Sequence, residues 1–340
     1  MDRERRFTFC ILLAAALFIL TTTFLYITHN DVTALASQRV DTAYLERPTL
    51  IYALPKELIP DTDNDRRLII LGDIHGMAKP LNRLLAKTKY NAATDHVISA
   101  GDMINKGPDS GAVVDTLMRL NASAVRGNHE DNVLSALAAH RRGRKAPKKF
   151  LKTGKKLSKK QVEWIAQLPV ILSMEELAMY VVHAGMVPGV RPAMQDPWAV
   201  MNMRTLLYSK EELRSRSEDE DPVPESDDYE REIEDDQDVE IDDDETRTQL
   251  DFYNDRSEAP IPSDTRDGKQ WAPVWNRRQD QQRKSTRRTI VYGHDAKRGL
   301  RQGKHTYGLD SACVYGGKLT ALVLQGSKKG YKGKLVQVQC

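Results

Sequence analysis

Short apolar runs alternate with amphipathic stretches along most of the chain. Five of these runs have the length and apolar content of buried strands, at residues 68–71, 97–100, 122–125, 179–182 and 289–292. Residues at helical spacing follow the first run, namely Leu81, Leu84 and Leu85, and the second, namely Val113, Val114, Leu117 and Leu120. Strands that alternate with helices predict an α/β fold.

Each apolar run leads into a short segment of metal-binding residue types. The segments are Gly72-Asp73-Ile74-His75-Gly76, Gly101-Asp102, Gly127-Asn128-His129-Glu130, His183-Ala184-Gly185 and Gly293-His294. Carboxylate, imidazole and amide ligands suit Zn or Mn, with Co also compatible, better than they suit Ca or Mg. Two divalent ions supply a bridging hydroxide and stabilise charge on both oxygens of an in-line displacement. The segments therefore predict a two-metal hydrolase of phosphate esters or anhydrides.

The positions of these side chains predict a role for each of them. Asp102 is expected to bridge the two ions through its carboxylate. His129 sits next to a ligand and is the expected general acid for the leaving group. The ligands expected for the first ion are Asp73 and His75, and those for the second are Asn128, His183 and His294.

These segments resemble those of the calcineurin-like metallophosphoesterases, and more narrowly the phosphoprotein-phosphatase group that includes protein phosphatase 1 and bacterial diadenosine tetraphosphatase. The resemblance covers residues 66–325. Within the group, residues 101–110 and 308–317 look like the diadenosine-tetraphosphatase branch. The resemblance implies a two-sheet β-sandwich flanked by helices, with the metal ions at the ends of the strands.

Two residues depart from the pattern of eukaryotic protein phosphatases, which usually carry Asp and Arg where this chain has Asn105 and Lys106. An Asp would favour the protonated form of the catalytic imidazole, and Asn105 cannot supply that charge. A serine alkoxide must be protonated to leave, whereas a polyphosphate or nucleotide phosphate is already a good leaving group. Asn105 therefore favours cleavage of phosphoanhydrides over cleavage of phosphoserine. Neutral drift at Asn105 inside a protein phosphatase stays open as the alternative.

Four basic residues are candidates for phosphate binding. Lys106 stands where protein phosphatases carry Arg. Its ammonium group is a point charge that still attracts phosphate, but it lacks the two parallel N–H donors of a guanidinium. Arg126 and one of Arg277 or Arg278 are expected to join it. Bracing of its own loop is the alternative role for Arg126.

The N-terminal part predicts a membrane anchor. Residues 7–27 form an uncharged, mostly apolar run long enough to cross a bilayer, and Arg3, Arg5 and Arg6 precede it. No small-residue cleavage site follows, which favours a retained signal anchor. We expect a cytosolic tail at 1–6, a stalk at 28–65 and the catalytic domain at 66–340 on the far side of the membrane.

A net charge of +3 conceals two segments of opposite sign. About half of residues 141–160 are Lys or Arg, and residues 218–245 are mostly Asp or Glu. The acidic segment lies in a predicted disordered insertion, 215–268.

The basic segment leads into a predicted capping box at Ser158 and Gln161. It either guides a long polyanion toward the metals or is a solvated loop. Nucleic acid is not expected, because no aromatic stacking platform accompanies it.

The anchor, the Asn105 variant and the basic segment together resemble the fungal vacuolar endopolyphosphatases. That resemblance implies a zinc-dependent enzyme that cuts inside inorganic polyphosphate, as a single-pass type II protein of the vacuole membrane with a lumenal catalytic domain. The alternatives are a serine/threonine phosphoprotein phosphatase, a dinucleoside-polyphosphate hydrolase, or a catalytically dead polyanion-binding protein. Whether Cys313 and Cys340 pair is left open, since pairing requires the last strand to lie beside the segment 307–315.

Overall fold

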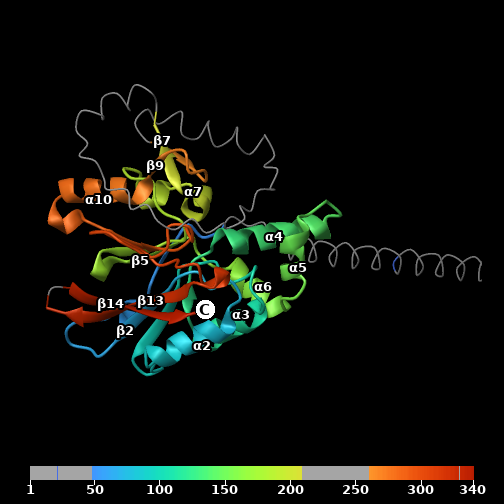
Figure 1. Cartoon of the computed structure of the whole chain (residues 1–340), viewed down its shortest axis with the longest axis horizontal. Coiled ribbons are helices and arrows are strands. Elements are labelled where there is room, and N and C mark those ends of the chain that lie inside the picture. Colours follow the sequence, from blue (N-terminus) through green and yellow to red (C-terminus); the bar gives the residue numbers. More distant parts are fainter. Residues whose placement is uncertain (1–20, 22–47, 209–259, 329) are drawn as a thin grey trace, which may run out of the picture. The chain divides into compact units, whose positions relative to one another are not determined.

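The computed structural model describes residue 21 and residues 48–208, 260–328 and 330–340 (Figure 1). Apart from Thr21, the predicted tail and membrane segment lie outside these ranges, as does the acidic segment 218–245. Within the described ranges, no helix combines the length and apolar character needed to cross a bilayer. The expected transmembrane helix is therefore not found in the part of the chain that the structure describes.

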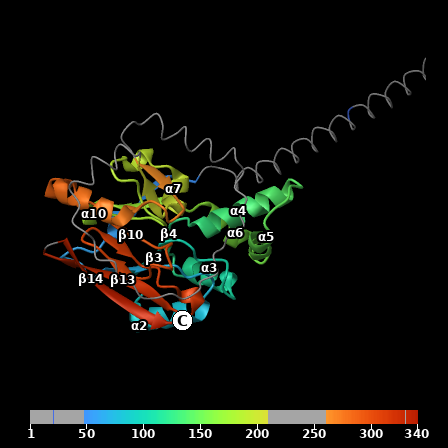
Figure 2. The ribbon, with the colours of Figure 1, turned by 45° about the horizontal axis from the view of Figure 1, so that its top comes forward.

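Two β-sheets form the centre of the unit that spans residues 47–340 (Figures 1 and 2). The six-stranded sheet has the order β1 (Ile51–Ala53), β5 (Ile171–Met174), β6 (Met179–Val181), β10 (Thr289–Tyr292), β12 (Thr306–Gly308) and β11 (Arg301–Gln302). The five-stranded sheet has the order β14 (Gly330–Gln339), β13 (Lys318–Ser327), β2 (Arg67–Leu71), β3 (Asp95–Ser99) and β4 (Ser123–Ala124). A smaller sheet joins β8 (Ile261–Ser263), β7 (Thr205–Leu207) and β9 (Lys269–Gln270).

The main hydrophobic core lies between the two large sheets. Leu68 and Ile70 of β2 pack there with Leu172 and Val291 of the opposite sheet. Successive residues of a strand point to opposite faces, so Ile290 and Tyr292 of β10 belong to a second core. Both faces of each sheet are thus covered, which explains why the strands read as nearly continuous apolar runs.

Helices cover the outer faces of the sheets. The helix α2 (Ala78–Lys87) packs on β13 and β14, with α3 (Ser110–Arg119) beside it (Figure 1). Apolar residues of α7 (Pro197–Asn202) and α10 (Trp271–Gln281) join the second core on the six-stranded sheet. The helices α4 (Asn128–Arg141), α5 (Lys148–Gly154) and α6 (Lys159–Ala166) pack together beyond β4. The expected α/β fold with two sheets is confirmed.

Four sequence predictions can be compared directly with these elements. All five predicted strands are present, as β2, β3, β4, β6 and β10. The capping box is confirmed, since Ser158 Oγ accepts from the backbone of Gln161 and Gln161 Oε1 accepts from the backbone of Ser158. The described end of the predicted stalk, 48–65, contributes β1, which pairs with β5. The described end of the predicted insertion, 260–268, contributes β8, which pairs with β7.

Candidate metal centre

The predicted metal ligands meet where strands of both sheets end. Asp73 and His75 follow β2, Asp102 follows β3, Asn128 begins α4, His183 follows β6, and His294 follows β10. Three of them, His75, Asp102 and His294, adopt left-handed backbone conformations with φ of 45°, 49° and 74°. Such conformations cost roughly 1–3 kcal/mol each outside glycine and cluster at functional sites. The fold thus holds these side chains in place at a cost in backbone strain.

Asp102 has the geometry of a bridging carboxylate. Its Oδ2 lies 3.5 Å from His75 Nε2, and its Oδ1 lies 3.3 Å from His183 Nε2. Only 2 % of the residue is exposed. Each oxygen faces a different group of ligands, so one carboxylate can serve two ions.

The hydrogen bonds of His183 and His294 identify the nitrogens that are free to bind a metal. His183 Nδ1 lies 2.9 Å from the carbonyl oxygen of Ala100, and His294 Nε2 lies 2.9 Å from that of Asn202. A carbonyl only accepts, so these ring nitrogens donate and the neutral rings keep lone pairs on His183 Nε2 and His294 Nδ1. The two lone-pair nitrogens lie 3.2 Å apart. A shared cation, or a proton on one of the two rings, accounts for that approach.

The first group of ligands is oriented in the same way. His75 Nδ1 lies 3.1 Å from the carbonyl oxygen of Ile104, which leaves Nε2 facing Asp102. Asp73 Oδ2 lies 4.0 Å from His75 Nε2. The backbone N–H of His294 donates to both oxygens of Asp73. Such outer hydrogen bonds fix ligand orientation at metal sites.

Asn128 turns its amide oxygen toward the other ligands. Asn128 Oδ1 lies 3.0 Å from His183 Nε2 and also faces the carboxylate of Asp102. An oxygen that faces only acceptors is what a metal ligand requires. The opposite amide orientation would instead let the nitrogen donate to the same atoms. A cation at this point satisfies the observed orientation.

The donor set fits two divalent ions. Ligand atoms of His75, Asp102 and His129 lie within 4.8 Å of one another, and so do those of Asp102, His183 and His294. A binuclear site of this kind, when loaded, supplies a hydroxide nucleophile and neutralises charge on the phosphoryl group. Mixed imidazole and oxygen donors are typical of transition-metal sites.

The protonation states of three predicted ligands agree with metal binding. Burial lowers the pKa of His75 to about 4 and holds the pKa of His294 well below its ordinary value. Burial alone would raise the pKa of Asp102, but the charges of His183 and His129 outweigh it and hold that pKa well below its usual range. Metal ligands must be deprotonated, and these three residues favour that form. For His183 burial lowers the pKa but the charge of Asp102 outweighs it, and burial raises the pKa of Asp73, so these two ligands hold a proton more strongly than usual.

His129 lies at the edge of the first group of ligands. Its Nε2 lies 3.9 Å from Asp102 Oδ2, and its Nδ1 lies 2.8 Å from Asn105 Nδ2. The rings of His129 and His75 meet edge to face with centroids 4.7 Å apart. The ring therefore presents Nε2 to the metal side and is held at Nδ1 by Asn105, as its expected role requires.

Glu130 supports the site although the sequence suggested no role for it. This fully buried carboxylate accepts hydrogen bonds from the backbone N–H groups of Gly127, Asp102, Met103 and Ile104 at 2.8–3.2 Å. One side chain thus fixes two metal-binding loops that are far apart in sequence. Its place in the segment 127–130 is the only signal in the sequence.

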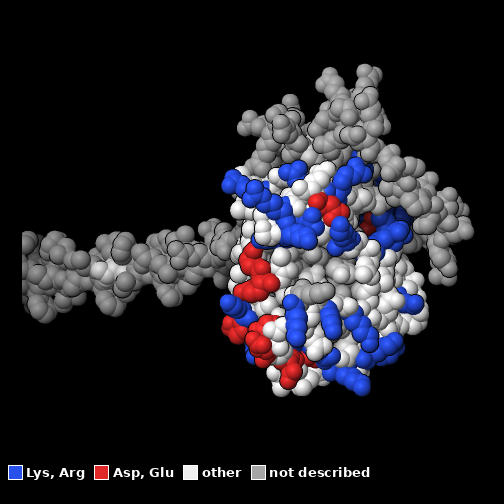
Figure 3. Space-filling view, turned by 90° about the vertical axis from the view of Figure 1, so that its left-hand side faces the viewer, with Lys and Arg blue, Asp and Glu red and all other residues white. Residues whose placement is uncertain are grey.

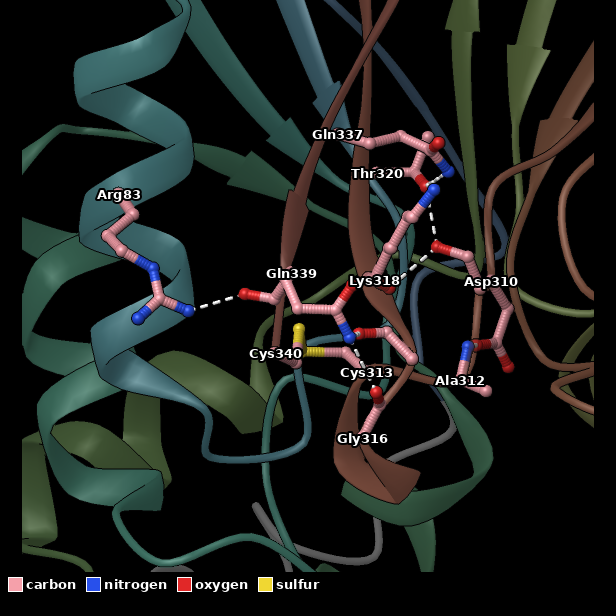
Figure 4. The surroundings of a disulfide bond; sticks show 12 residues. Arg83, Asp310, Ala312, Cys313, Gly316, Lys318, Thr320, Gln337, Gln339 and Cys340 are labelled. Atoms are coloured by element: carbon pink, nitrogen blue, oxygen red, sulfur yellow. Dashed lines mark hydrogen bonds between the residues drawn. A yellow bond between two sulfur atoms is a disulfide. The ribbon is translucent and has the colours of Figure 1, made fainter.

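The C-terminal strand stabilises another loop next to the site (Figure 4). Cys313 and Cys340 form a disulfide with Cα atoms 5.2 Å apart, so the pairing left open above is present. The disulfide joins the end of β14 to the loop that follows Asp310. Asp310 is buried, and burial together with the charge of Asp310 raises the pKa of Asp73. The loop after Asp310 therefore affects the surroundings of a metal ligand.

The predicted phosphate-binding residues lie in different surroundings. Lys106 places Nζ 5.4 Å from the centre of the Tyr315 ring at the loop closed by the disulfide. Arg126 is buried and donates to the carbonyl of Ala166 and to Asp131, so the bracing role has direct contacts. These positions leave phosphate binding by Lys106 and Arg126 as a prediction.

Arg277 and Arg278 are exposed on α10. The guanidinium of Arg278 lies against Gly189. Figure 3 shows that Lys and Arg gather in several groups on the face of the molecule that carries this helix. Their role in binding substrate also stays a prediction.

Arg204 is a basic residue near the site that the sequence did not single out. It lies between α7 and β7, and its Nε is buried without a hydrogen-bond partner in the described ranges. After burial, its charge is the next cause that lowers the pKa of His294. It also lines a cavity of about 220 Å³ that reaches His294. Arg204 belongs to none of the five predicted motifs, so the sequence alone did not indicate that it lies near His294.

Comparison with known proteins places this arrangement in a family. The sequence model described as Calcineurin-like phosphoesterase matches residues 66–324, which is most of the chain. The chain belongs to this family. The match includes every predicted ligand, so the chain is a metal-binding hydrolase of the metallophosphoesterase family.

The curated relatives of this calcineurin-like phosphoesterase include bacterial enzymes. A symmetrical bis(5'-nucleosyl)-tetraphosphatase of Ralstonia nicotianae is 28% identical over 79% of this chain and 93% of its own length. One from Klebsiella pneumoniae is 25% identical over 74% of this chain and 89% of its own length. A crystal structure of a protein proposed to be a diadenosine tetraphosphatase has a TM-score of 0.59 and 26% identity, and the match covers 85% of this chain and 97% of that one.

These findings correct the expected localisation. These relatives are bacterial enzymes, so the prediction of a vacuole membrane protein is wrong. The vacuole was implied by the resemblance to the fungal vacuolar endopolyphosphatases, whereas the apolar run 7–27 indicated only a membrane. The finer resemblance to endopolyphosphatases is also not shown by these relatives.

Proposed function

We propose that this calcineurin-like phosphoesterase hydrolyses a phosphoanhydride bond of dinucleoside polyphosphates such as diadenosine tetraphosphate. The observation that carries the proposal is the contact between Asn105 Nδ2 and His129 Nδ1 at 2.8 Å. An amide nitrogen donates, so His129 Nδ1 accepts and the neutral ring carries its hydrogen on Nε2. A neutral imidazole helps a leaving group that needs little protonation, and a nucleoside polyphosphate is such a group. The names of the relatives support the same substrate class.

The residues of the proposed active site would have three roles: metal binding, hydrogen bonding to the leaving group and phosphate binding. Asp73, His75, Asp102, Asn128, His183 and His294 would hold two ions, for which Zn or Mn is our proposal and Co a further candidate. His129 would donate a hydrogen bond from its Nε2–H to the departing phosphate oxygen, without giving up the proton. Lys106 would attract the phosphate groups that flank the scissile bond, since it lies one residue after Asn105 and its side chain is exposed beside Tyr315.

Inorganic polyphosphate is a second candidate substrate, favoured by the basic segment 141–160. Its lysines at 148, 149, 152, 155 and 156 are all exposed. The same segment reaches the site, because the ring of Phe150 meets that of His129 with centroids 5.8 Å apart. A long polyanion bound at the metals therefore has a row of exposed positive charges close by.

A substrate panel tests the proposed function. The full-length protein is loaded with Zn, Mn or Co and assayed on diadenosine tetraphosphate, long polyphosphate and a phosphoserine peptide, with Asp102→Asn as the inactive control. We expect metal-dependent turnover to be highest on diadenosine tetraphosphate. Higher kcat/KM on the phosphopeptide would overturn the proposal in favour of a protein phosphatase.

A charge variant separates the two anhydride substrates. Neutralising Lys148, Lys149, Lys155 and Lys156 to Gln should weaken hydrolysis of long polyphosphate if the basic segment guides that substrate, and the deficit should shrink as salt rises. Tripolyphosphate is too short to reach both the metals and the segment, so it serves as the control. Equal losses on long and short chains would remove the segment from substrate binding.

A further inference from the structure

The basic segment contains a helix that packs into the site. On α5, Phe150 is 3 % exposed and meets the ring of His129. Gly154 of the same helix packs so closely on Leu137 of α4 that a side chain at 154 would collide with it. The position of α5 relative to α4, which begins with Asn128 and His129, is therefore fixed by close packing.

One polar residue of α5 faces the active site. Thr153 Oγ1 lies 2.8 Å from Asn105 Oδ1, across 48 positions of sequence. Asn105 is buried and adopts a left-handed backbone conformation with φ of 70°. Its other amide atom, Nδ2, lies 2.8 Å from His129 Nδ1. Thr153, Asn105 and His129 thus form a continuous chain of hydrogen bonds.

The direction of this chain follows from the chemistry of its atoms. The Thr153 hydroxyl has one hydrogen, and Oγ1 lies 2.8 Å from Asn105 Oδ1 but 3.3 Å from the carbonyl of Lys149. The shorter and better contact takes the hydrogen, so Thr153 donates to the oxygen of the amide. That bond orients the amide with its nitrogen toward His129, whose Nδ1 then accepts and whose Nε2 keeps the hydrogen.

We propose that Thr153 is a positioning residue that fixes the Asn105 amide and, through it, holds His129 with its Nε2–H toward the leaving group. This inference rests on the proposed role of His129 as hydrogen donor and extends the site to α5. Without the hydroxyl, the amide can rotate and the ring loses its fixed hydrogen-bond partner. A leaving-group donor displaced by about 1 Å can cost up to roughly 100-fold in rate, so a measurable loss follows.

The experiment compares Thr153→Val with Thr153→Ser. Valine keeps the shape and removes the hydroxyl, whereas serine keeps the hydroxyl. We expect Thr153→Val to lower kcat on diadenosine tetraphosphate roughly tenfold while KM and metal content stay unchanged, and Thr153→Ser to restore most of the loss. The matched control is Thr286→Val, which removes a threonine hydroxyl that donates to the carbonyl of Arg283. A rise in KM with unchanged kcat, or equal losses in the valine and serine variants, would overturn the proposal.

A second readout does not depend on the substrate. In protein labelled with ¹⁵N-histidine, the His129 signals are assigned by comparison with His129→Gln. The wild type should show a hydrogen-free Nδ1 and a hydrogen-bearing Nε2, and Thr153→Val should show a mixture of the two tautomers. An unchanged tautomer would overturn the positioning role even if the protein proves to cleave another phosphate substrate. If Thr153→Val alters the tautomer but the protein does not cleave diadenosine tetraphosphate, the positioning role of Thr153 is supported and only the proposed substrate is wrong.

Discussion

Nε2 of His183 and Nδ1 of His294 lie 3.2 Å apart, and the carbonyl contacts of both rings leave a lone pair on each of these nitrogens. Two lone pairs repel at this distance unless a cation lies between them or one ring is protonated. Burial opposes protonation of His294, because it lowers the pKa of that ring. Burial also lowers the pKa of His183, but the charge and hydrogen bond of Asp102 outweigh burial and raise that pKa. A proton on His183 or a bound cation therefore accounts for the contact, and a metal ion would displace that proton.

Removing single ligands should distinguish the two ions. His294→Ala removes a ligand of one ion only, so we expect the protein to keep about one equivalent of metal. Asp102→Asn weakens the shared bridge, so we expect loss of both ions and of turnover. Metal analysis of the dialysed proteins gives the stoichiometry. Two bound ions in Asp102→Asn with full activity would exclude the bridging role.

Glu130→Ala should destabilise the protein. The change leaves four backbone N–H groups without their acceptor, and each unsatisfied buried donor costs about 1–3 kcal/mol. We expect a loss of at least about 3 kcal/mol in the free energy of unfolding, measured by urea denaturation. Glu163→Ala is the control, because its ion pair with Lys159 is exposed and should contribute little. Similar midpoints for the two variants would contradict the anchoring role.

The disulfide should contribute to stability in the same assay. It closes a loop with a sequence separation of 27, for which chain entropy predicts about 3.5 kcal/mol. Cys313→Ser and Cys340→Ser should lower the melting temperature equally. A reducing agent should lower the wild-type value and leave both variants unchanged. Unequal variants would show that one cysteine acts outside the disulfide.

His96 predicts a pH dependence of stability away from the metals. It lies on β3 with Nε2 2.9 Å from Ser123 Oγ, and burial, followed by the charge of Arg66, lowers its pKa from 6.5 to about 4. The folded protein therefore resists protonation of His96 while the unfolded chain accepts it. Its contribution to stability is complete above pH 6.5 and is lost as the pH falls through about 4. His96→Gln should reduce the pH dependence of the melting temperature in this window, and an identical pH profile would contradict the assignment.

The sequence predicted the parts of the site that depend on local pattern. Buried strands read as apolar runs, and each metal ligand follows such a run, so Asp102 and His183 could be assigned before their contact was known. The strand β1 was not predicted, because two of its three residues are exposed and no run of buried apolar residues marks it. Glu130, Thr153 and Arg204 act through contacts with residues distant in the chain, and only the packing of helices and loops brings those partners together.

The products formed from diadenosine tetraphosphate test the central claim most directly. The full-length protein, loaded with Zn or Mn, is incubated with this substrate and the nucleotides are separated by chromatography, with Asp102→Asn as the control. We expect metal-dependent conversion to two molecules of ADP, in line with the symmetrical cleavage in the names of the relatives, and no conversion by the variant. No turnover by the metal-loaded wild type, or equal turnover by Asp102→Asn, would contradict it.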